Sequence, residues 1–214
     1  MENLKQELSS KTEVYVLSFD VRHRHEVQSA IASLPSAWQT IDVLINNAGN
    51  AHGLSMIHEG DQDDWDAMLD INVKGLLNVS REILPVMTKQ NSGHIINIGS
   101  IAGKEVYAKG NVYCASKFAV DAITQGMRID LNAHGIKVTG IHPGLVNTEF
   151  SKVRFKGDEE KAEKVYEGMT PLKGEDIADI ILFAITRPAH VQLADLVVFP
   201  TAQASSTTVL RQTK

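Results

Sequence analysis

Apolar residues recur along the chain with two spacings, either at every second residue or at every third and fourth residue. The first spacing predicts strands and the second predicts helices. Short apolar runs predict strands over residues 13–19, 41–45, 94–98, 136–141 and 196–199. Amphipathic patterns predict helices over residues 1–9, 22–34, 61–89, 111–133 and 175–186. Residues 146–169 are predicted to form an irregular, charged lobe.

The order of these elements predicts the fold class. Strands that alternate with helices, without an internal repeat or linker, are typical of an α/β protein with a doubly wound parallel sheet. The 214 residues are enough for one such domain with a full core. In these sheets ligands bind just beyond the carboxyl ends of the strands. The polar motifs of this chain lie at those positions, so we expect one domain with one site.

Composition and charge limit the kinds of molecule that this chain is expected to bind. The formal net charge is -5, so there is no domain-wide basic excess to neutralise nucleic-acid phosphates. The longest apolar run is too short to span a bilayer, and no secretory signal precedes the first amphipathic segment. The single cysteine, Cys114, excludes an internal disulfide framework and fits a reducing compartment. We therefore expect a cytoplasmic protein with no nucleic-acid partner and no membrane partner.

The strongest chemical signal is Tyr113, followed four residues later by Lys117 in the predicted helix 111–133. Residues four apart lie on one helix face, so both side chains point into the same space. A free tyrosine has a pKa near 10 and is a poor base at neutral pH. One positive charge at about 4 Å, in an effective dielectric of about 20, contributes roughly 4 kcal/mol, or about three pKa units. We therefore expect Lys117 to lower the pKa of Tyr113, and Ser100 to donate to the same substrate oxygen.

A lone Tyr-x-x-x-Lys pattern also fits an ordinary pair on a helix surface, so companion motifs decide its meaning. Such motifs follow the predicted strands or lie in the predicted helix 61–89. They are Asp20-Val21, Asn46-Asn47-Ala48-Gly49, Asn72, Ser100 and Pro143-Gly144-x-Val146-x-Thr148. In order and spacing, these motifs resemble those of the short-chain dehydrogenase/reductase family, and the resemblance covers essentially the whole chain. It implies a single Rossmann-type domain over residues 1–214.

The resemblance implies a role for each residue of the catalytic group. Tyr113 would pass a proton to or from the substrate oxygen while a nicotinamide takes or gives the hydride. Lys117 would lower the pKa of Tyr113 and hold the nicotinamide ribose, and Ser100 would orient the substrate oxygen. Asn72 would anchor a water in a proton relay; without the resemblance, it is equally well explained as a polar residue that interrupts a helix.

The resemblance also implies an NADP site, with NAD as the alternative. Asp20 and Val21 would contact the adenine, although Asp20 alone is as well explained as a helix cap. The other implied cofactor residues are Asn47, Ala48, Gly49, Tyr113, Lys117, Pro143, Gly144, Val146 and Thr148. No zinc spacing occurs among the histidines, and the acidic run 61–66 lacks the glycine of a calcium loop, so no metal is expected.

Within the family, residues 151–158 resemble the NADP-dependent 3-hydroxy acid dehydrogenases that accept serine and allo-threonine. The implied function is an oxidoreductase that acts on the CH–OH group of a small hydroxy acid, as a homodimer or homotetramer. Either Arg154 or Lys156 would then contact a substrate carboxylate. Solvated surface charges explain these two residues equally well.

The family opens with a strand and a Thr-Gly-x-x-x-Gly-x-Gly turn that holds the cofactor pyrophosphate, and this sequence has no such turn near its start. We therefore expect an N-terminally truncated sheet that lacks the first βαβ unit. The predicted strand 13–19 would have no partner on its inner side. The alternative function is a catalytically impaired scaffold that only oligomerises or binds a metabolite.

Overall fold

A computed structural model describes residues 2–212. Its main sheet is parallel throughout and has the strand order β1-β2-β3-β6. The strands are β1 (Val43–Asn46), β2 (Gly93–Ile98), β3 (Ile136–Pro143) and β6 (Asp195–Val198). The helices are α1 (Glu2–Leu8), α2 (Arg24–Ala32), α3 (Gln62–Leu69), α4 (Leu76–Gln90), α5 (Asn111–Asp130), α6 (Phe150–Arg154), α7 (Glu159–Lys164) and α8 (Gly174–Ile185). The α/β class and the parallel sheet are confirmed.

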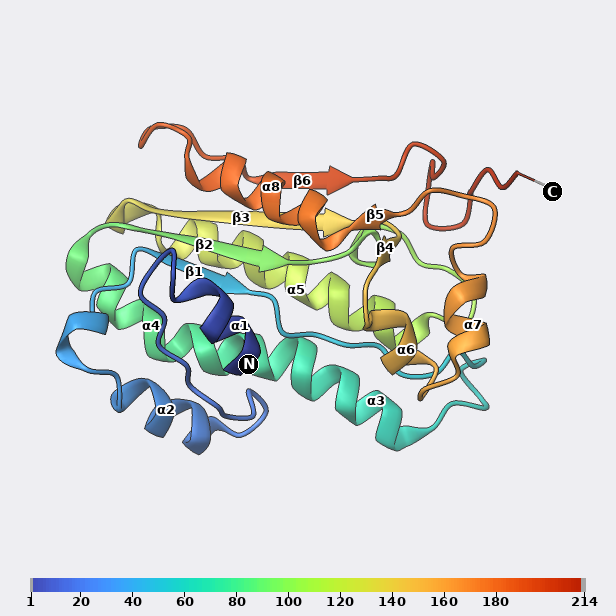
Figure 1. Ribbon diagram of the computed structural model, residues 1–214, viewed down its shortest axis with the longest axis horizontal. Coiled ribbons are helices and arrows are strands. Elements are labelled where there is room, and N and C mark those ends of the chain that lie inside the picture. The colour runs from blue at the N-terminus through green and yellow to red at the C-terminus, as the bar shows by residue number, and fades with distance from the viewer. Residues whose placement is uncertain (1, 213–214) are drawn as a thin grey trace.

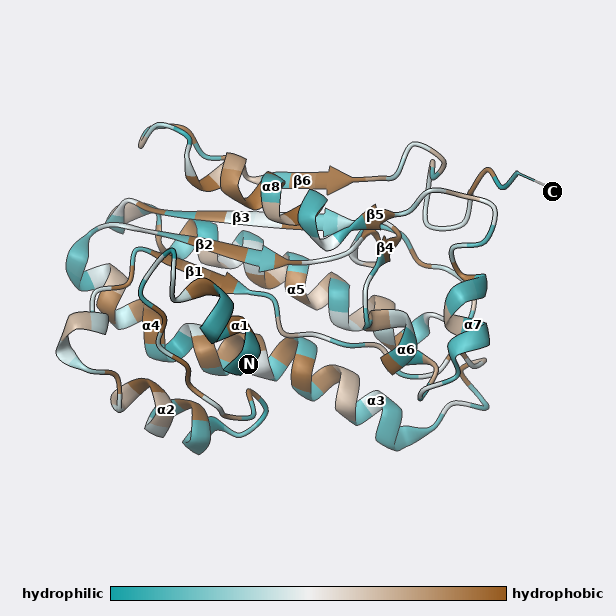
Figure 2. Ribbon diagram, viewed as in Figure 1, coloured by the Kyte–Doolittle hydropathy of each residue, from teal (hydrophilic) through white to brown (hydrophobic). Residues whose placement is uncertain are grey.

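Helices cover both faces of the sheet, as Figure 1 shows. On one face α4 and α5 pack against β2 and β3 around Met87, Ile95, Val120 and Val138. On the other face α8 covers Ile96 and Ile141. Neighbouring residues of β2 therefore serve opposite cores, as expected for a strand buried on both sides. The strands and the inner helix faces form the hydrophobic parts of Figure 2.

The predicted strand 13–19 is wrong, because residues 13–20 have no regular secondary structure. A strand forms only when its backbone groups pair with a neighbour. Within the described residues, β1 pairs with β2 on one side and has no strand on its other side. The outer edge of β1 leaves Val43 and Ile45 partly exposed, at 36% and 44%. Residues 13–19 have the alternation of a strand, but the described residues contain no neighbouring strand that pairs with them.

The predicted helix 61–89 divides into α3, a π-helix over Asp70–Gly75, and α4. Asp61 caps α3, since its carboxylate accepts a hydrogen bond of 2.9 Å from the Asp63 backbone N–H. Single π-helical turns within helices occur frequently at functional sites. This turn contains Asn72, and at Gly75 an added Cβ would lie 2.7 Å from a Val21 methyl group.

The lobe of residues 146–169 is more regular than its sequence predicts. It contains α6 and α7, and the short strand β4 (Val146–Asn147) pairs in parallel with β5 (Leu172–Lys173). The C-terminal tail crosses the end of this lobe, where the Arg211 guanidinium donates to the Val165 and Glu167 carbonyls at 2.9 Å and 2.5 Å. In the part of the chain that the structure describes, no helix is both long enough and apolar enough to cross a membrane.

His94 gives the fold a specific sensitivity to acid. Its ring is buried in β2, where Nε2 lies 2.8 Å from Thr139 Oγ1. Within residues 2–212, Nδ1 has no hydrogen-bond partner. Burial lowers the pKa of His94 to about 4, from a usual value of 6.5. The unfolded chain therefore binds a proton at a higher pH than the folded chain, and the folded state loses stability as the pH falls below about 6.5.

We expect protonation at His94 alone to lower the free energy of unfolding by about 2 kcal/mol between about pH 7 and pH 5. Urea unfolding at both pH values tests this, with His94→Gln expected to remove that part of the loss. His25→Gln, at an exposed position, is the matched control. An unchanged pH dependence in the His94 variant would contradict the assignment.

Candidate active site

The site lies where the N-terminal half of α5 faces the end of β2. Tyr113 and Lys117 are both buried on the same side of α5. Ser100 follows β2 and caps a short 3-10 turn, accepting a 3.1 Å hydrogen bond from the Ala102 backbone N–H. The Ser100 side chain lies close enough to the Tyr113 hydroxyl to lower its pKa. The structure therefore brings Ser100 close to Tyr113, the two residues expected to bind the substrate oxygen, and places Lys117 one turn further along the same face of α5.

The expected lowering of the Tyr113 pKa is wrong in sign for this structure. Burial, the largest effect, raises the pKa of Tyr113 well above its usual value of 10. The Ser100 side chain and the positive charge of Arg154 lower this pKa by smaller amounts. The physical reason is desolvation, because a phenolate in this enclosed position loses the water that would stabilise its charge.

Lys117 is hydrogen-bonded to the backbone at the end of β2. Its ammonium donates to the Ile98 carbonyl at the end of β2, at 3.0 Å. Desolvation by burial lowers the pKa of Lys117 to about 8. An added Cβ at Gly49 would lie 3.4 Å from the Lys117 Nζ atom, so the loop after β1 passes directly beside this ammonium. The Lys117 ammonium is thus bonded to the end of β2 and lies beside the loop that follows β1.

Asn72 is buried in the π-helical turn and fixes the adjoining loop. Its Oδ1 atom accepts from the Asn50 backbone N–H at 2.8 Å, and its Nδ2 atom donates to the Asn50 carbonyl at 2.9 Å. Nδ2 also donates to Ser116 Oγ on α5 at 2.9 Å. Asn72 therefore joins three segments of the site by hydrogen bonds, namely the π-helical turn, the loop at Asn50 and α5.

Four of the expected cofactor residues line one surface cleft of about 640 Å³. They are Asp20, Val21, Ala48 and Gly49. Arg22 binds the Asp20 carboxylate at 2.6 Å, and this hydrogen-bonded pair lowers the pKa of Asp20 to about 2. The N-cap of α2 is His23, so Asp20 is not the helix cap.

The cleft is compatible with a bound nucleotide. At Gly49 an added Cβ would lie 3.0 Å from the Asn72 Oδ1 atom, so only a residue without a side chain keeps this wall open. The cleft is also lined by two carboxylates, Asp20 and Glu26, which can accept hydrogen bonds from a sugar or base. Asn47 lies beside it with an exposed side chain and a backbone N–H bonded to the Ile45 carbonyl at 3.1 Å.

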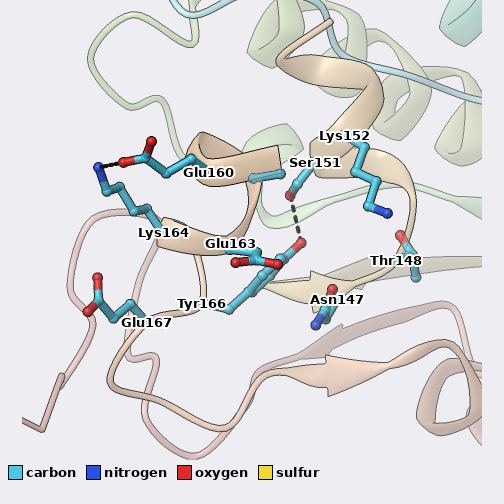
Figure 3. A pocket seen from close by; sticks show the side chains of 10 residues that line it. Asn147, Thr148, Ser151, Lys152, Glu160, Glu163, Lys164, Tyr166 and Glu167 are labelled. Carbon is cyan, nitrogen blue, oxygen red and sulfur yellow. Dashed lines mark hydrogen bonds and ion pairs between the residues drawn. The ribbon is translucent and has the colours of Figure 1, made fainter. Parts of the chain in front are cut away.

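The Pro-Gly motif lies at the end of β3, on the other side of β2 from that cleft. Pro143 is buried, and the Gly144 N–H donates to the Val198 carbonyl at 2.8 Å. The Val146 carbonyl accepts from the Tyr166 hydroxyl at 2.8 Å. Thr148 lines a separate cavity of about 420 Å³ between β4, α6 and α7, shown in Figure 3. Of the expected cofactor residues, Thr148 thus lines a different hollow from Asp20, Val21, Ala48 and Gly49.

Three residues of the lobe and its neighbouring loop surround Tyr113, although their sequence positions alone give no sign of it. The Phe150 ring lies 5.7 Å from the Tyr113 ring, between centroids. The Arg154 guanidinium carbon lies 5.5 Å from the Tyr113 ring centroid and 5.6 Å from that of Tyr107. Of these residues, only Arg154 is predicted from the sequence to lie at the site, as a possible contact of a substrate carboxylate.

A cluster of charged residues lies behind Ser100. Ligand atoms of Asp121, His142 and Asp195 lie within 4.8 Å of one another, a spacing that can hold a metal ion. Here the Lys104 ammonium binds both carboxylates, at 2.8 Å and 2.7 Å. Burial and the Lys104 charge lower the pKa of His142. The lysine thus already supplies the positive charge that the two carboxylates require.

A protein with this parallel sheet, a buried tyrosine and lysine, and a partly buried serine beside the tyrosine has the features of a dehydrogenase. Residues 1–159 match the short chain dehydrogenase family, and the chain belongs to that family. The NADP-dependent 3-hydroxy acid dehydrogenase YdfG of Salmonella typhi is 47% identical over 204 residues, covering 95% of this chain and 82% of that protein. The NADP-dependent 3-hydroxy acid dehydrogenase of Schizosaccharomyces pombe is 44% identical, covering 99% of this chain and 83% of that protein.

Solved structures agree with this assignment. The closed form of serine dehydrogenase complexed with NADP+ superimposes with a TM-score of 0.91 at 42% identity, covering 99% of this chain and 87% of that one. Serine dehydrogenase from Escherichia coli has a TM-score of 0.81 at 38% identity, covering 95% and 83%. The Rossmann-like fold class is thereby confirmed.

Asn72→Ala should lower the free energy of unfolding by about 1–3 kcal/mol, because it leaves the buried polar groups of Asn50 and Ser116 without their partner. Urea unfolding measures this loss. Asn147→Ala, at an exposed position, is the control and should change stability by less than about 0.5 kcal/mol. Equal effects of the two substitutions would contradict the structural role of Asn72.

Proposed function

We propose that this protein is an oxidoreductase that transfers a hydride between NADP and the CH–OH group of a small 3-hydroxy acid, of the serine or allo-threonine type. The observation that carries the proposal is the buried Tyr113 phenol, close to the Ser100 side chain and on the same helix face as Lys117. The similarity to NADP-dependent 3-hydroxy acid dehydrogenases supports the choice of cofactor and substrate. NAD is the alternative cofactor.

The proposed chemistry assigns a proton to Tyr113 and a hydride to the cofactor. When bound, the nicotinamide cofactor supplies or accepts the hydride. The Ser100 hydroxyl orients the substrate oxygen by donating a hydrogen bond to it. Tyr113 carries its proton at neutral pH, because its pKa is not below the usual value of 10, and in this proposal it donates that proton to a carbonyl oxygen during reduction. The nearby positive charge of Arg154 favours the phenolate that remains.

The cofactor would lie along the carboxyl ends of the strands. In this proposal Asp20, Val21, Ala48 and Gly49 hold the adenosine end in their shared cleft. Asn47, Tyr113, Lys117, Pro143, Gly144, Val146 and Thr148 complete the proposed cofactor site, and Ser100 with Tyr113 binds the substrate. Asn72 is a positioning residue, because it acts on the site through Asn50 and Ser116.

We also propose a homodimer or homotetramer in the cytoplasm. The helices α3, α4 and α5 carry apolar side chains that are exposed in the single chain, which supports a subunit contact there. They are Leu69, Leu77, Phe118 and Ile129. The only cysteine, Cys114, is a free thiol buried in α5, which suits a reducing compartment.

Tyr113→Phe should lower kcat by about 10²–10⁴-fold, the usual range for losing a general acid. The measurement is NADPH oxidation with a 3-oxo acid, or NADP reduction with serine. The ring remains, so packing against Phe150 and thermal stability should be nearly unchanged. Full activity in this variant would rule out Tyr113 as the proton donor, and inactivity of the parent chain would favour the scaffold alternative.

A further inference from the structure

Arg154 places a guanidinium beside the residue that handles the substrate oxygen. It is the last residue of α6, is only partly exposed, and lies against the rings of both Tyr107 and Tyr113. Its Nη2 atom donates to the Tyr107 hydroxyl at 2.8 Å, and its Nε atom donates to the Gly53 carbonyl at 3.3 Å. The guanidinium is thus held in one orientation by two neutral acceptors.

No carboxylate neutralises this charge within residues 2–212, where Arg154 forms no ion pair within 4.0 Å. Lys156, the other cation expected to meet a substrate carboxylate, differs in this respect. Its ammonium lies 2.9 Å from the Asp64 carboxylate and is 59% exposed. A partly buried cation without an anion is costly unless a ligand supplies one.

Arg154 also keeps enough donors to bind an anion. An arginine has five N–H donors, and the two hydrogen bonds to Gly53 and Tyr107 use two of them. The remaining donors include both of those on Nη1. A planar guanidinium of this kind binds a carboxylate through two parallel hydrogen bonds.

We propose that Arg154 binds the substrate carboxylate and thereby selects 3-hydroxy acids over neutral alcohols. The inference rests on the proposed oxidoreductase function and adds its substrate-recognising residue. In a 3-hydroxy acid only two carbon–carbon bonds separate the reacting carbon from the carboxylate carbon. A substrate with its hydroxyl at Tyr113 and Ser100 therefore places its carboxylate within reach of the guanidinium that lies against the Tyr113 ring.

Hydrogen bonds between Arg154 and Gly53 also attach the lobe to the loop after β1. Arg154 and Gly53 exchange two hydrogen bonds, since the Gly53 N–H donates to the Arg154 carbonyl at 3.0 Å and the Arg154 Nε donates to the Gly53 carbonyl. The guanidinium is therefore fixed to the loop after β1 before any substrate arrives. Such preorganisation lowers the entropy lost on binding.

The test compares a 3-hydroxy acid with its methyl ester, which keeps the hydroxyl and removes the charge. Steady-state kinetics with 3-hydroxybutyrate and methyl 3-hydroxybutyrate are measured for the parent chain, Arg154→Met, Arg154→Lys and Lys156→Met. For Arg154→Met, kcat/KM on the acid should fall by about 30- to 1,000-fold, mainly through KM. The ester should lose less, because it is affected only by removal of the Arg154 charge beside Tyr113, so the acid-to-ester ratio of kcat/KM should fall by about 10-fold or more. Arg154→Lys should be intermediate, and Lys156→Met should resemble the parent.

Equal losses on acid and ester in Arg154→Met would overturn the inference, because they would mean that the residue acts on Tyr113 or on the fold. Thermal unfolding of each variant separates a folding defect from a binding defect. Should Arg154→Met not fold, an unchanged acid-to-ester ratio in Arg154→Lys would overturn the inference equally. A parent chain inactive on both substrates would instead contradict the proposed function.

Discussion

The site depends on the burial of two titratable side chains, Tyr113 and Lys117, where α5 packs against the end of β2. A buried ammonium requires an acceptor, and Lys117 finds one in the Ile98 carbonyl. This contact fixes the rotation of α5 relative to the sheet, because turning the helix would leave the charge without a partner. The pKa of Lys117 falls to about 8, so the ammonium still carries most of its charge at neutral pH.

The same burial raises the pKa of Tyr113. A Coulomb estimate for one nearby cation predicts an acidic phenol, but it omits the cost of removing water from the phenolate. Here that cost is the largest effect on the Tyr113 pKa, and the smaller opposing effects come from Ser100 and Arg154. The enclosed site therefore holds a proton donor beside a hydroxyl and a guanidinium, an arrangement suited to protonating an oxygen.

Much of the fold could be predicted from the sequence, because buried parallel strands and amphipathic helices leave a periodic signal. The failures have definite causes. Residues 13–19 carry a strand pattern, but pairing depends on a neighbouring strand that no local pattern encodes. The π-helical turn at Asp70–Gly75 resembles ordinary helix in sequence, and only backbone packing near Val21 and Gly75 reveals it. Tyr113, Ser100 and Lys117 were identifiable by spacing, whereas the contacts of Phe150 with Tyr113 required the folded chain.

The residues proposed to move the proton and the residue proposed to bind the substrate carboxylate lie in different parts of this structure. The proton-handling residues lie just after β2 and on α5, which pack in the core, whereas Phe150 and Arg154 belong to a lobe joined to the core by few elements. Its position is set by Arg154 on Gly53 and by Arg211 on the carbonyls near the end of α7. A scaffold of this kind lets specificity change in the lobe without disturbing the residues that move the proton. A carboxylate bound to Arg154 would contact the lobe while the substrate oxygen contacts the core, so a single small ligand would bridge the two.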